Sequence, residues 1–317
     1  MLDIERTLAE ARQHQSAGRF AQAEQLYRQV LQVEPDQPVA LHLLGVLAHM
    51  ARQSEVGVDL IRSALRVAPE YVAAWNNLGN VLRELGNQQE AATAFAKAIE
   101  IKPDYAEAHG NMGLALQSLD RLNDAMSSYR KALEIKPNMA NVLNNLGQAL
   151  CLAGEVGEAI DRFTQAIALN PDSAHFHYNL SKARKQCGQF EESVASLQAA
   201  VKHQPDWSDA HYSLGLTLQR LGRLNEAEHS YRCALELSPD RADFHTGLAS
   251  VLELRGHLQE ALVSYEKALE LNPQAREAAG SIGSILLALG KTEEGLVMEQ
   301  KGFGVVNFDK NLGVSMA

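Results

Sequence analysis

Histidine is the residue type in this sequence best suited to metal binding or acid–base chemistry, and the chain contains 11 histidines. Four of them are separated by 34 residues or by twice that number: His109, His177, His211 and His245. Residues with so long a fixed spacing occupy equivalent places in successive packed helices, which lie about 8–10 Å apart. The ligands of one metal ion must all lie about 2 Å from it. We therefore interpret these histidines as packing residues and predict no metal site.

Other signatures of catalysis are weak. The Gly-Lys-Thr sequence at 290–292 resembles the end of a phosphate-binding loop, but Ile285 stands where that loop needs glycine, and no strand is expected before it. No G-x-S-x-G, H-E-x-x-H or C-x-x-C sequence occurs. The cysteines are three and far apart, which indicates thiols in a reducing compartment: Cys151, Cys187 and Cys233. The sequence predicts that the protein is not an enzyme, with no catalytic residues and no cofactor.

Asparagine forms the pattern that most favours a binding function. It recurs every 34 residues, at Asn77, Asn111, Asn145 and Asn179. Asparagine is a mediocre helix former, so helix propensity does not explain the recurrence. A side-chain amide carries a donor and an acceptor, which match the N–H and C=O of an extended peptide. We expect these amides to bind a peptide main chain; the alternative is that each bonds the backbone of the next structural unit.

Further polar residues fall on the same face of the expected helices. They are mostly neutral amides with a few basic residues: Asn76, Asn80, Arg83, Gln117, Asn144, Gln148, Lys182 and Lys185. Among them, the candidate peptide contacts are Asn80, Arg83, Gln117 and Gln148. The asparagine series lapses at Ser213, Gly247 and Ser281. This lapse predicts a binding stretch confined to the third to sixth units.

The prolines identify the structural unit that positions these side chains. Eight of the 9 prolines lie 34 residues apart, at Pro35, Pro69, Pro103, Pro137, Pro171, Pro205, Pro239 and Pro273. Proline lacks an N–H and disfavours helix at the preceding residue, so each of these positions ends a helix. A 34-residue period with helical patterning predicts a stack of helix pairs.

One period shows how the pair is specified. In residues 72–105, apolar and small residues follow a helical period at Trp75, Leu78, Gly79 and Leu82. Gly86 is suited to the left-handed conformation that ends the first helix. A second buried stripe follows at Ala91, Phe95 and Ala98. The period therefore contains a helical hairpin with its own stop signals.

This hairpin resembles the tetratricopeptide repeat, whose pattern is W-x2-L-G-x2-Y, then A-x3-F, then P. Leu-Gly pairs recur in phase at 44–45, 78–79, 146–147 and 214–215, and departures occur at Gly57, Ile61, Ser181, Ser193 and Leu197. The resemblance implies an all-α fold, a right-handed superhelical solenoid of antiparallel helix pairs whose first helices line a concave groove. Eight full repeats are expected over 4–275 and a degenerate ninth from 276, within a solenoid spanning 1–301. Residues 302–317 are expected to form an irregular or strand-like tail.

Two groups within this family were compared with the asparagine series. The chaperone-adaptor class clamps a carboxylate with two asparagines, matched by Asn80 and Asn111, and with three basic residues. Asn76, Asn141 and Asn145 stand at those basic positions, which excludes such a clamp. The sequence at 75–82 also resembles the asparagine-lined repeats of O-linked N-acetylglucosamine transferases and their bacterial relatives. That resemblance implies an alternative function, the recruitment of substrates for a catalytic domain that is absent or supplied in trans.

Charge and hydrophobicity narrow the class of partner. The formal net charge of −10 argues against a nucleic-acid partner. No run of 18 apolar residues occurs, so membrane insertion is not expected, and the N-terminal residues lack a signal-sequence pattern, which favours the cytoplasm. The expected function is a scaffold that binds an extended protein segment. Self-association through the C-terminal end is a further expectation, because a decayed last repeat leaves apolar surface uncovered.

Overall fold

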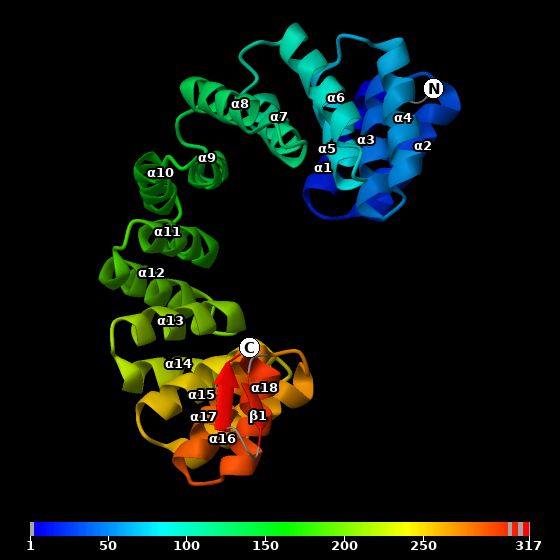
Figure 1. Cartoon of the computed structure of the whole chain (residues 1–317). Coiled ribbons are helices and arrows are strands. Elements are labelled where there is room, and N and C mark those ends of the chain that lie inside the picture. The colour runs from blue at the N-terminus through cyan, green and yellow to red at the C-terminus, as the bar shows by residue number, and fades with distance from the viewer. Residues whose placement is uncertain (1–2, 304–305, 310–312, 317) are drawn as a thin grey trace. The chain divides into compact units, whose positions relative to one another are not determined.

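The computed structural model describes residues 3–303, 306–309 and 313–316, and it describes side chains for the first of these ranges. The described residues form 18 helices and a β-hairpin. The chain divides into two compact units, Met1–Leu169 and Asn170–Ala317, and each unit is described by itself. The all-α, paired-helix solenoid expected from the sequence is confirmed (Figure 1).

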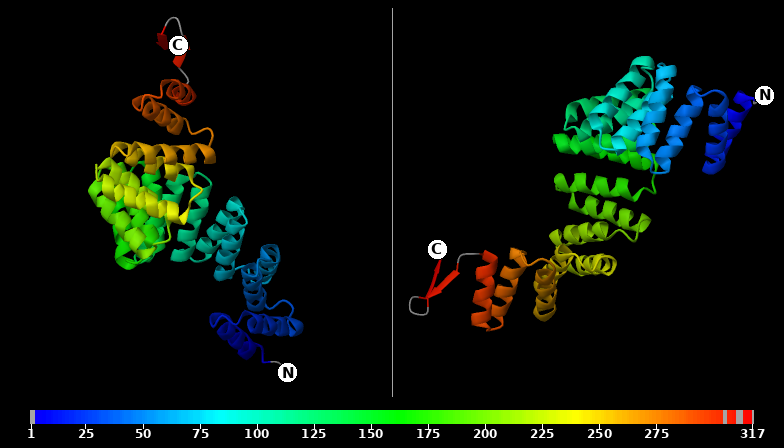
Figure 2. Two further views of the ribbon diagram at one scale, coloured as in Figure 1. Left: turned by 90° about the horizontal axis from the view of Figure 1, so that it is seen from below. Right: turned by 90° about the vertical axis from the view of Figure 1, so that its right-hand side faces the viewer.

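The helices of the first unit are α1 (Ile4–Ser16), α2 (Phe20–Val33), α3 (Pro38–Met50), α4 (Ser54–Val67), α5 (Val72–Glu84), α6 (Gln88–Ile101), α7 (Ala106–Ser118), α8 (Leu122–Ile135), α9 (Ala140–Ala153) and α10 (Val156–Leu169). Those of the second unit are α11 (Ala174–Gln186), α12 (Phe190–His203), α13 (Ser208–Arg220), α14 (Leu224–Leu237), α15 (Ala242–Leu254), α16 (Leu258–Leu271), α17 (Arg276–Ala288) and α18 (Thr292–Phe303). Each odd-numbered helix, the first of a repeat, begins 34 residues after the previous one. It packs antiparallel against the even-numbered second helix that follows it (Figure 2).

The turn inside each repeat uses a left-handed residue at one fixed position. Seven of these residues are glycines with φ between 73° and 83°, at 18, 86, 154, 188, 222, 256 and 290. Arg52 (φ 63°) and Asp120 (φ 57°) hold the same conformation at the two remaining turns. Glycine adopts this conformation at no steric cost, which explains its recurrence. The glycine of the Gly-Lys-Thr sequence is one of these turn residues, so its role is structural.

Close packing inside a repeat depends on the glycine in the middle of the first helix. A Cβ atom placed on Gly113 would lie 2.4 Å from the ring of Tyr129, and one on Gly79 would lie 2.5 Å from the ring of Phe95. The same contact joins Gly147 to Phe163 and Gly215 to Tyr231. No side chain fits between the two helices at these positions. The Leu-Gly signature therefore reflects the contact between a helix backbone and an aromatic ring.

The sixth repeat, formed by α11 and α12, departs from the pattern at both members of this contact. Ser181 replaces the glycine and Leu197 replaces the ring, and both residues are fully buried. The Ser181 hydroxyl donates to the carbonyl of Tyr178 (2.6 Å), and the Ser193 hydroxyl donates to the carbonyl of Ser181 (3.0 Å). A larger residue on the first helix is thus matched by a smaller one on the second. The departures compensate each other and keep the repeat in register.

The second-helix ring is a tyrosine in those repeats where the first helix offers an oxygen acceptor twelve residues earlier. The hydroxyl of Tyr27 donates to Gln15, that of Tyr129 to Gln117, that of Tyr231 to Gln219 and that of Tyr265 to Glu253, at 2.8–3.0 Å. Arg83 and Cys151 stand at this first-helix position in the repeats that carry Phe95 and Phe163. A buried phenol needs a hydrogen-bond partner, whereas phenylalanine does not.

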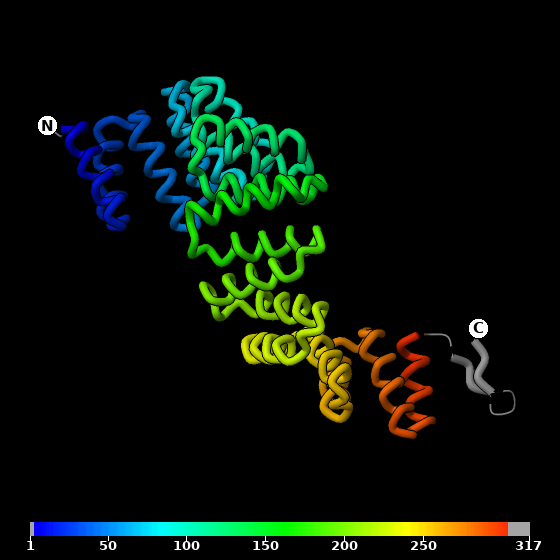
Figure 3. Tube along the Cα trace, turned by 90° about the vertical axis from the view of Figure 1, so that its left-hand side faces the viewer, coloured from blue at the N-terminus to red at the C-terminus, as the bar shows by residue number. Residues whose placement is uncertain are grey.

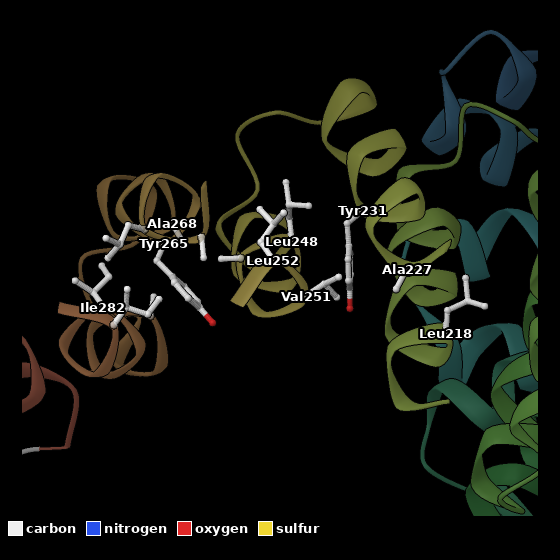
Figure 4. Packing of buried hydrophobic residues seen from close by; sticks show 14 of the residues in the cluster. Leu218, Ala227, Tyr231, Leu248, Val251, Leu252, Tyr265, Ala268 and Ile282 are labelled. Carbon is white, nitrogen blue, oxygen red and sulfur yellow. The ribbon is translucent and has the colours of Figure 1, made fainter. Parts of the chain in front are cut away.

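Burial of these rings is continuous through the second unit. Tyr231 and Tyr265 lie among Leu218, Leu248 and Leu252 in one cluster of buried residues that extends from α12 to α17 (Figure 4). Each ring contacts both its own first helix and that of the next repeat. The repeats therefore share one core rather than forming separate small ones.

The last helix pair, α17 and α18, forms although the sequence predicts a degenerate ninth repeat there. A Cβ atom on Gly283 would lie 2.9 Å from the carbonyl oxygen of Gly295, and one on Gly302 would lie 2.4 Å from the backbone of Gly280. Facing glycines let α17 and α18 pack backbone to backbone where most other repeats carry their aromatic ring, a position held here by Glu299. Figure 3 shows these last two helices side by side at the orange and red end of the helical array. After α18, strand β1 (Val306–Asp309) pairs antiparallel with β2 (Gly313–Met316), with Val306 opposite Met316.

The compensation seen in the sixth repeat can be transferred to the fourth. Gly113→Ser should destabilise the chain by about 1–3 kcal/mol, because the new side chain meets the Tyr129 ring. The double variant with Tyr129→Leu should lose at least about 1 kcal/mol less than the sum of the single losses. Urea unfolding followed by circular dichroism measures these values. The pair Gly113→Ser and Tyr27→Leu, three repeats apart, is the control that should be additive, and additivity in the first pair would contradict the steric account.

Candidate functional site

The first helices form the more closely spaced layer of each unit. In the first unit α3 contacts α5, α5 contacts α7 and α7 contacts α9, and in the second unit α13 contacts α15. No pair of second helices within the described residues is in comparable contact. A stack with this asymmetry curves toward its first helices. The candidate residues on α5, α7 and α9 therefore share the inner face of the first unit, and Asn179 lies on α11 in the second.

Asn77 belongs to a hydrogen-bonded chain that links two repeats. Its Nδ2 donates to Nε2 of His42 on α3 (2.8 Å), and Nδ1 of His42 lies 3.0 Å from the hydroxyl of Tyr71. A neutral imidazole accepts at one nitrogen and donates at the other. His42 is therefore protonated at Nδ1 and donates to Tyr71. The asparagine fixes the histidine tautomer.

His42 is 2% exposed and packs edge-on against the ring of Tyr71. Burial and, to a smaller extent, the positive charge of Arg12 together lower the pKa of His42 from 6.5 to about 4. The charged form is disfavoured because it would lose its hydration and its ability to accept from Asn77. Sequence reasoning missed this residue, since a lone histidine gives no signal of a partner 35 positions away.

Asn111 makes the corresponding link one repeat later. Its Nδ2 donates to Oδ1 of the buried Asn76 at 3.1 Å, again across 35 positions. In α9, Nδ2 of Asn144 lies 3.5 Å from Oδ1 of Asn145, within the same helix. The structural alternative for the asparagine series is thus realised in part, for Asn77 and Asn111. The partner is a side chain of the preceding repeat, not the backbone of the next.

The remaining candidates in the first unit differ in how far the fold occupies them. Gln117 accepts the Tyr129 hydroxyl at Oε1. The Nε atom of Arg83 is buried without a hydrogen-bond partner, and one terminal nitrogen of its guanidinium lies 3.9 Å from Glu84. Asn80 and Gln148 are half-buried and have no side-chain hydrogen bond among the described residues. These last two amides are therefore the ones most accessible to a ligand.

The recurring histidines have a structural role. Nε2 of His109, His177, His211 and His245 lies 2.8–2.9 Å from the carbonyl oxygen of the proline six residues earlier. The indole N–H of Trp75 donates to Pro69 in the same way, at 2.7 Å. Their interpretation as packing residues is confirmed, and each ring also bonds the carbonyl of the proline in the turn that precedes its helix. Over the described part of the chain, no group of three or more His, Cys, Asp or Glu side chains is placed to hold a metal ion.

The helices were also compared with the length and hydrophobicity that a membrane span requires. Within residues 3–303, none is long and apolar enough to cross a bilayer.

The buried His42 makes stability depend on pH. Because its pKa is lower in the folded state, the unfolded chain binds the extra proton between pH 6.5 and about 4, so stability should fall as pH falls through this window. The loss should reach up to about 3 kcal/mol for the first unit. His42→Asn should remove this contribution, because asparagine stands at the same place in the next repeat and still accepts from an amide. Denaturant unfolding at pH 7 and near pH 4 measures it, and equal pH slopes for both proteins would show that His42 is not the cause.

Comparisons with known proteins agree with this architecture. The family model described as the cilia and flagella-associated protein 70 C-terminal domain matches residues 1–213. A tetratricopeptide repeat model matches residues 212–275 and 255–296. A search of curated proteins gave no match.

Solved structures show the same fold. YrrB, described as a TPR protein with an unusual peptide-binding site, is 25% identical over 63% of this chain and 99% of its own, with a TM-score of 0.54. MamA is 24% identical over 51% of this chain and 95% of its own, with a TM-score of 0.50. PilF of Pseudomonas aeruginosa is 22% identical over 64% of this chain and 92% of its own, with a TM-score of 0.56. The chain therefore belongs to the tetratricopeptide-repeat family represented by the cilia and flagella-associated protein 70 C-terminal domain, and it is a protein-interaction scaffold of that type.

Proposed function

We propose that the inner face of the first unit binds an extended protein segment by its main chain. The observation that carries the proposal is that several side-chain amides on α5, α7 and α9 have atoms without a hydrogen bond among the described residues. Asn77 and Asn111 donate through Nδ2 to the preceding repeat, and neither Oδ1 atom has a hydrogen bond among the described residues. Asn80 and Gln148 keep both halves of their amides available.

Anchoring one half of an amide prepares the other half for a ligand. Since Nδ2 of Asn77 and Asn111 is held by a neighbour, each side chain has little rotational freedom left to lose when a peptide N–H donates to Oδ1. Preorganisation of this kind increases affinity by lowering the entropic cost of binding. Each hydrogen bond contributes about 0.5–1.5 kcal/mol, so several are needed. The recurrence of the amide along successive helices provides several.

The spacing of the helices suits an extended ligand. Neighbouring packed helices lie about 8–10 Å apart, so the distance from α5 to α9 across α7 corresponds to about six extended residues. Asn145 and Asn179 would extend the contact in each unit. The solved structure of YrrB, whose description names a peptide-binding site, supports a peptide as the class of ligand for this fold.

Arg83 and Gln117 supply the remaining contacts in this proposal. The terminal nitrogens of the Arg83 guanidinium make only one polar contact among the described residues, at 3.9 Å from Glu84, and Gln117 retains its Nε2 group after accepting from Tyr129. Both are donors and would pair with peptide carbonyl groups, which complements the acceptors of Asn77 and Asn111. The inner face would thus form hydrogen bonds with both the N–H and the C=O groups of a peptide main chain.

The second candidate function is substrate recruitment for a modifying enzyme. The asparagine-rich sequence at 75–82 favours it, because it resembles repeats that present protein substrates to a glycosyltransferase domain. Both functions use the same amides. They differ in whether the bound segment is then presented to a catalytic domain. We place either function in the cytoplasm, since Cys151, Cys187 and Cys233 form no disulfide, and we propose no role for nucleic acid given the net charge of −10.

Self-association through the C-terminal end is a third element of the proposal. Val297 and Phe303 on the last helix are 53% and 60% exposed. Exposed apolar side chains at the end of a repeat array favour contact with another surface.

A peptide library tests the main proposal. Random peptides of about ten residues, displayed on phage, should be enriched by the full chain. The double variant Asn80→Ala/Gln148→Ala should lose binding of the enriched peptides by about tenfold or more, because two hydrogen bonds are removed. The free energy of unfolding should be unchanged, since neither amide forms a side-chain hydrogen bond within the described part of the fold.

Amides on the second helices provide the matched control. Gln89 on α6 and Asn123 on α8 are exposed, and the variant Gln89→Ala/Asn123→Ala removes the same chemical groups from the other layer. It should bind as tightly as the unmodified chain. Equal losses in the two variants, or no loss in either, would contradict binding by the inner face.

A further inference from the structure

The second unit contains a cavity of about 730 Å³ between α11, α12, α13 and α15. Its lining includes Lys185, Phe190, Leu216, Arg220 and Leu254. No carboxylate lines it. This composition differs from that of the first unit, where neutral amides predominate.

The polar groups in the cavity that belong to the fold are already bonded. Gln219 accepts the Tyr231 hydroxyl at Oε1 and donates through Nε2 to Ser250 (2.9 Å). The Thr217 hydroxyl donates to the carbonyl of Ser213 at 2.7 Å. What the cavity offers a ligand is therefore its apolar surface, its cations and the exposed amide of Gln186.

The apolar surface comes from two successive first helices. Leu216 on α13 is 41% exposed and Leu254 on α15 is 61% exposed. Both leucines line this cavity. A leucine this exposed contributes little to the fold, and its burial by a ligand side chain would be favourable by about 25 cal/mol for each Å² removed from water.

The cations of this cavity have no counter-charge. Lys185 is half-buried and Arg220 places its guanidinium 4.5 Å from the centre of the Phe190 ring. Neither forms an ion pair within the described part of the chain, although the protein carries a net charge of −10. Arginines elsewhere in the same unit are paired: Arg223 with Glu191 and Glu226, and Arg241 with Asp209 and Asp243.

The fold does not require a lysine at position 185. In repeats with a second-helix tyrosine, the equivalent first-helix residue accepts the hydroxyl, as Gln117 and Gln219 do. Leu197 replaces the tyrosine in the sixth repeat, so Lys185 has no such partner. Burial lowers the pKa of Lys185, and the nearby charge of Lys182 lowers it further. A half-buried ammonium without a structural partner is costly unless an anion binds.

We propose that this cavity is a subsite for a peptide carboxylate that lies next to a large apolar side chain. The carboxylate would bind Lys185 and Arg220, and the apolar side chain would pack on Leu216 and Leu254. Charge-assisted hydrogen bonds of this kind are shorter and stronger than neutral ones. The inference rests on the proposed function, that first helices bind extended protein segments, and it specifies an acidic and apolar ligand.

Synthetic peptides test this specificity. Fluorescein-labelled peptides of about ten residues would carry a central leucine or phenylalanine flanked by Asp and Glu, by Asn and Gln, or by Lys and Arg. Fluorescence anisotropy with the full chain should show about tenfold or more tighter binding of the acidic set. Each peptide is made with a free and with an amidated C-terminus. Loss of affinity on amidation assigns the carboxylate to a chain end, and equal affinity assigns it to a side chain.

Paired variants locate the subsite. Lys185→Gln should reduce affinity for the acidic peptides by about tenfold and leave the neutral set unchanged. Lys202→Gln, an equal charge change at an exposed position of α12, should leave both unchanged. Leu254→Ser should weaken binding, whereas Val263→Ser on α16, where the valine is 66% exposed, should not. Circular dichroism confirms that each variant remains folded.

Two other outcomes separate this inference from the proposed function. If the three peptide sets bind with equal affinity, and Asn80→Ala/Gln148→Ala abolishes that binding, the carboxylate subsite is contradicted and peptide binding by the amide surface is supported. Absence of binding by any peptide would contradict both. Identical effects of Lys185→Gln and Lys202→Gln would show that general electrostatic attraction, not this cavity, accounts for the preference.

Discussion

The architecture depends on a contact between a helix backbone and an aromatic ring. The ring of Tyr129 or Phe95 occupies the space that a Cβ atom would need at Gly113 or Gly79. This contact fixes how closely the two helices of a repeat approach, and therefore how the next repeat stacks on them. Where the ring is missing, the chain restores the fit by another route: a serine–leucine pair in α11 and α12, and facing glycines in α17 and α18. The close approach is retained while the residues that achieve it vary.

The same contact controls which residues of the inner face are available. A tyrosine ring extends its hydroxyl toward the first helix and occupies an acceptor there, as with Gln117 and Gln219. A phenylalanine or leucine leaves the equivalent residue without this bond, as with Arg83 and Lys185. The identity of the buried second-helix residue, tyrosine or an apolar residue, is thus linked to whether the first-helix residue twelve positions earlier accepts a hydrogen bond from the core. Functional variation in such a scaffold can arise from core positions that never touch a ligand.

Much of the fold could be predicted from the sequence, because its signals are local. Prolines, turn glycines and the spacing of apolar residues act within a few positions, so helix pairs and their period follow directly. The hydrogen bonds of the site could not be predicted in this way. His42 meets Asn77, and Asn76 meets Asn111, across 35 positions, and these contacts exist only once the repeats stack. That Lys185 forms no ion pair among the described residues could not be predicted from the sequence either, because it depends on which residues surround the cavity in the folded chain. The peptide-binding role of the amides remains a prediction.

Side-chain amide signals in NMR spectra test the central claim most directly, that the inner-face amides bind a protein segment. Nitrogen-15 spectra of the full chain would be recorded with and without a peptide selected by binding, and the NH2 resonances assigned by substitution. The signals of Asn80 and Gln148 should shift, while those of Gln89 and Asn123 on the second helices should stay in place. Shifts confined to the second-helix amides, with Asn80 and Gln148 unaffected, would contradict binding by the inner face.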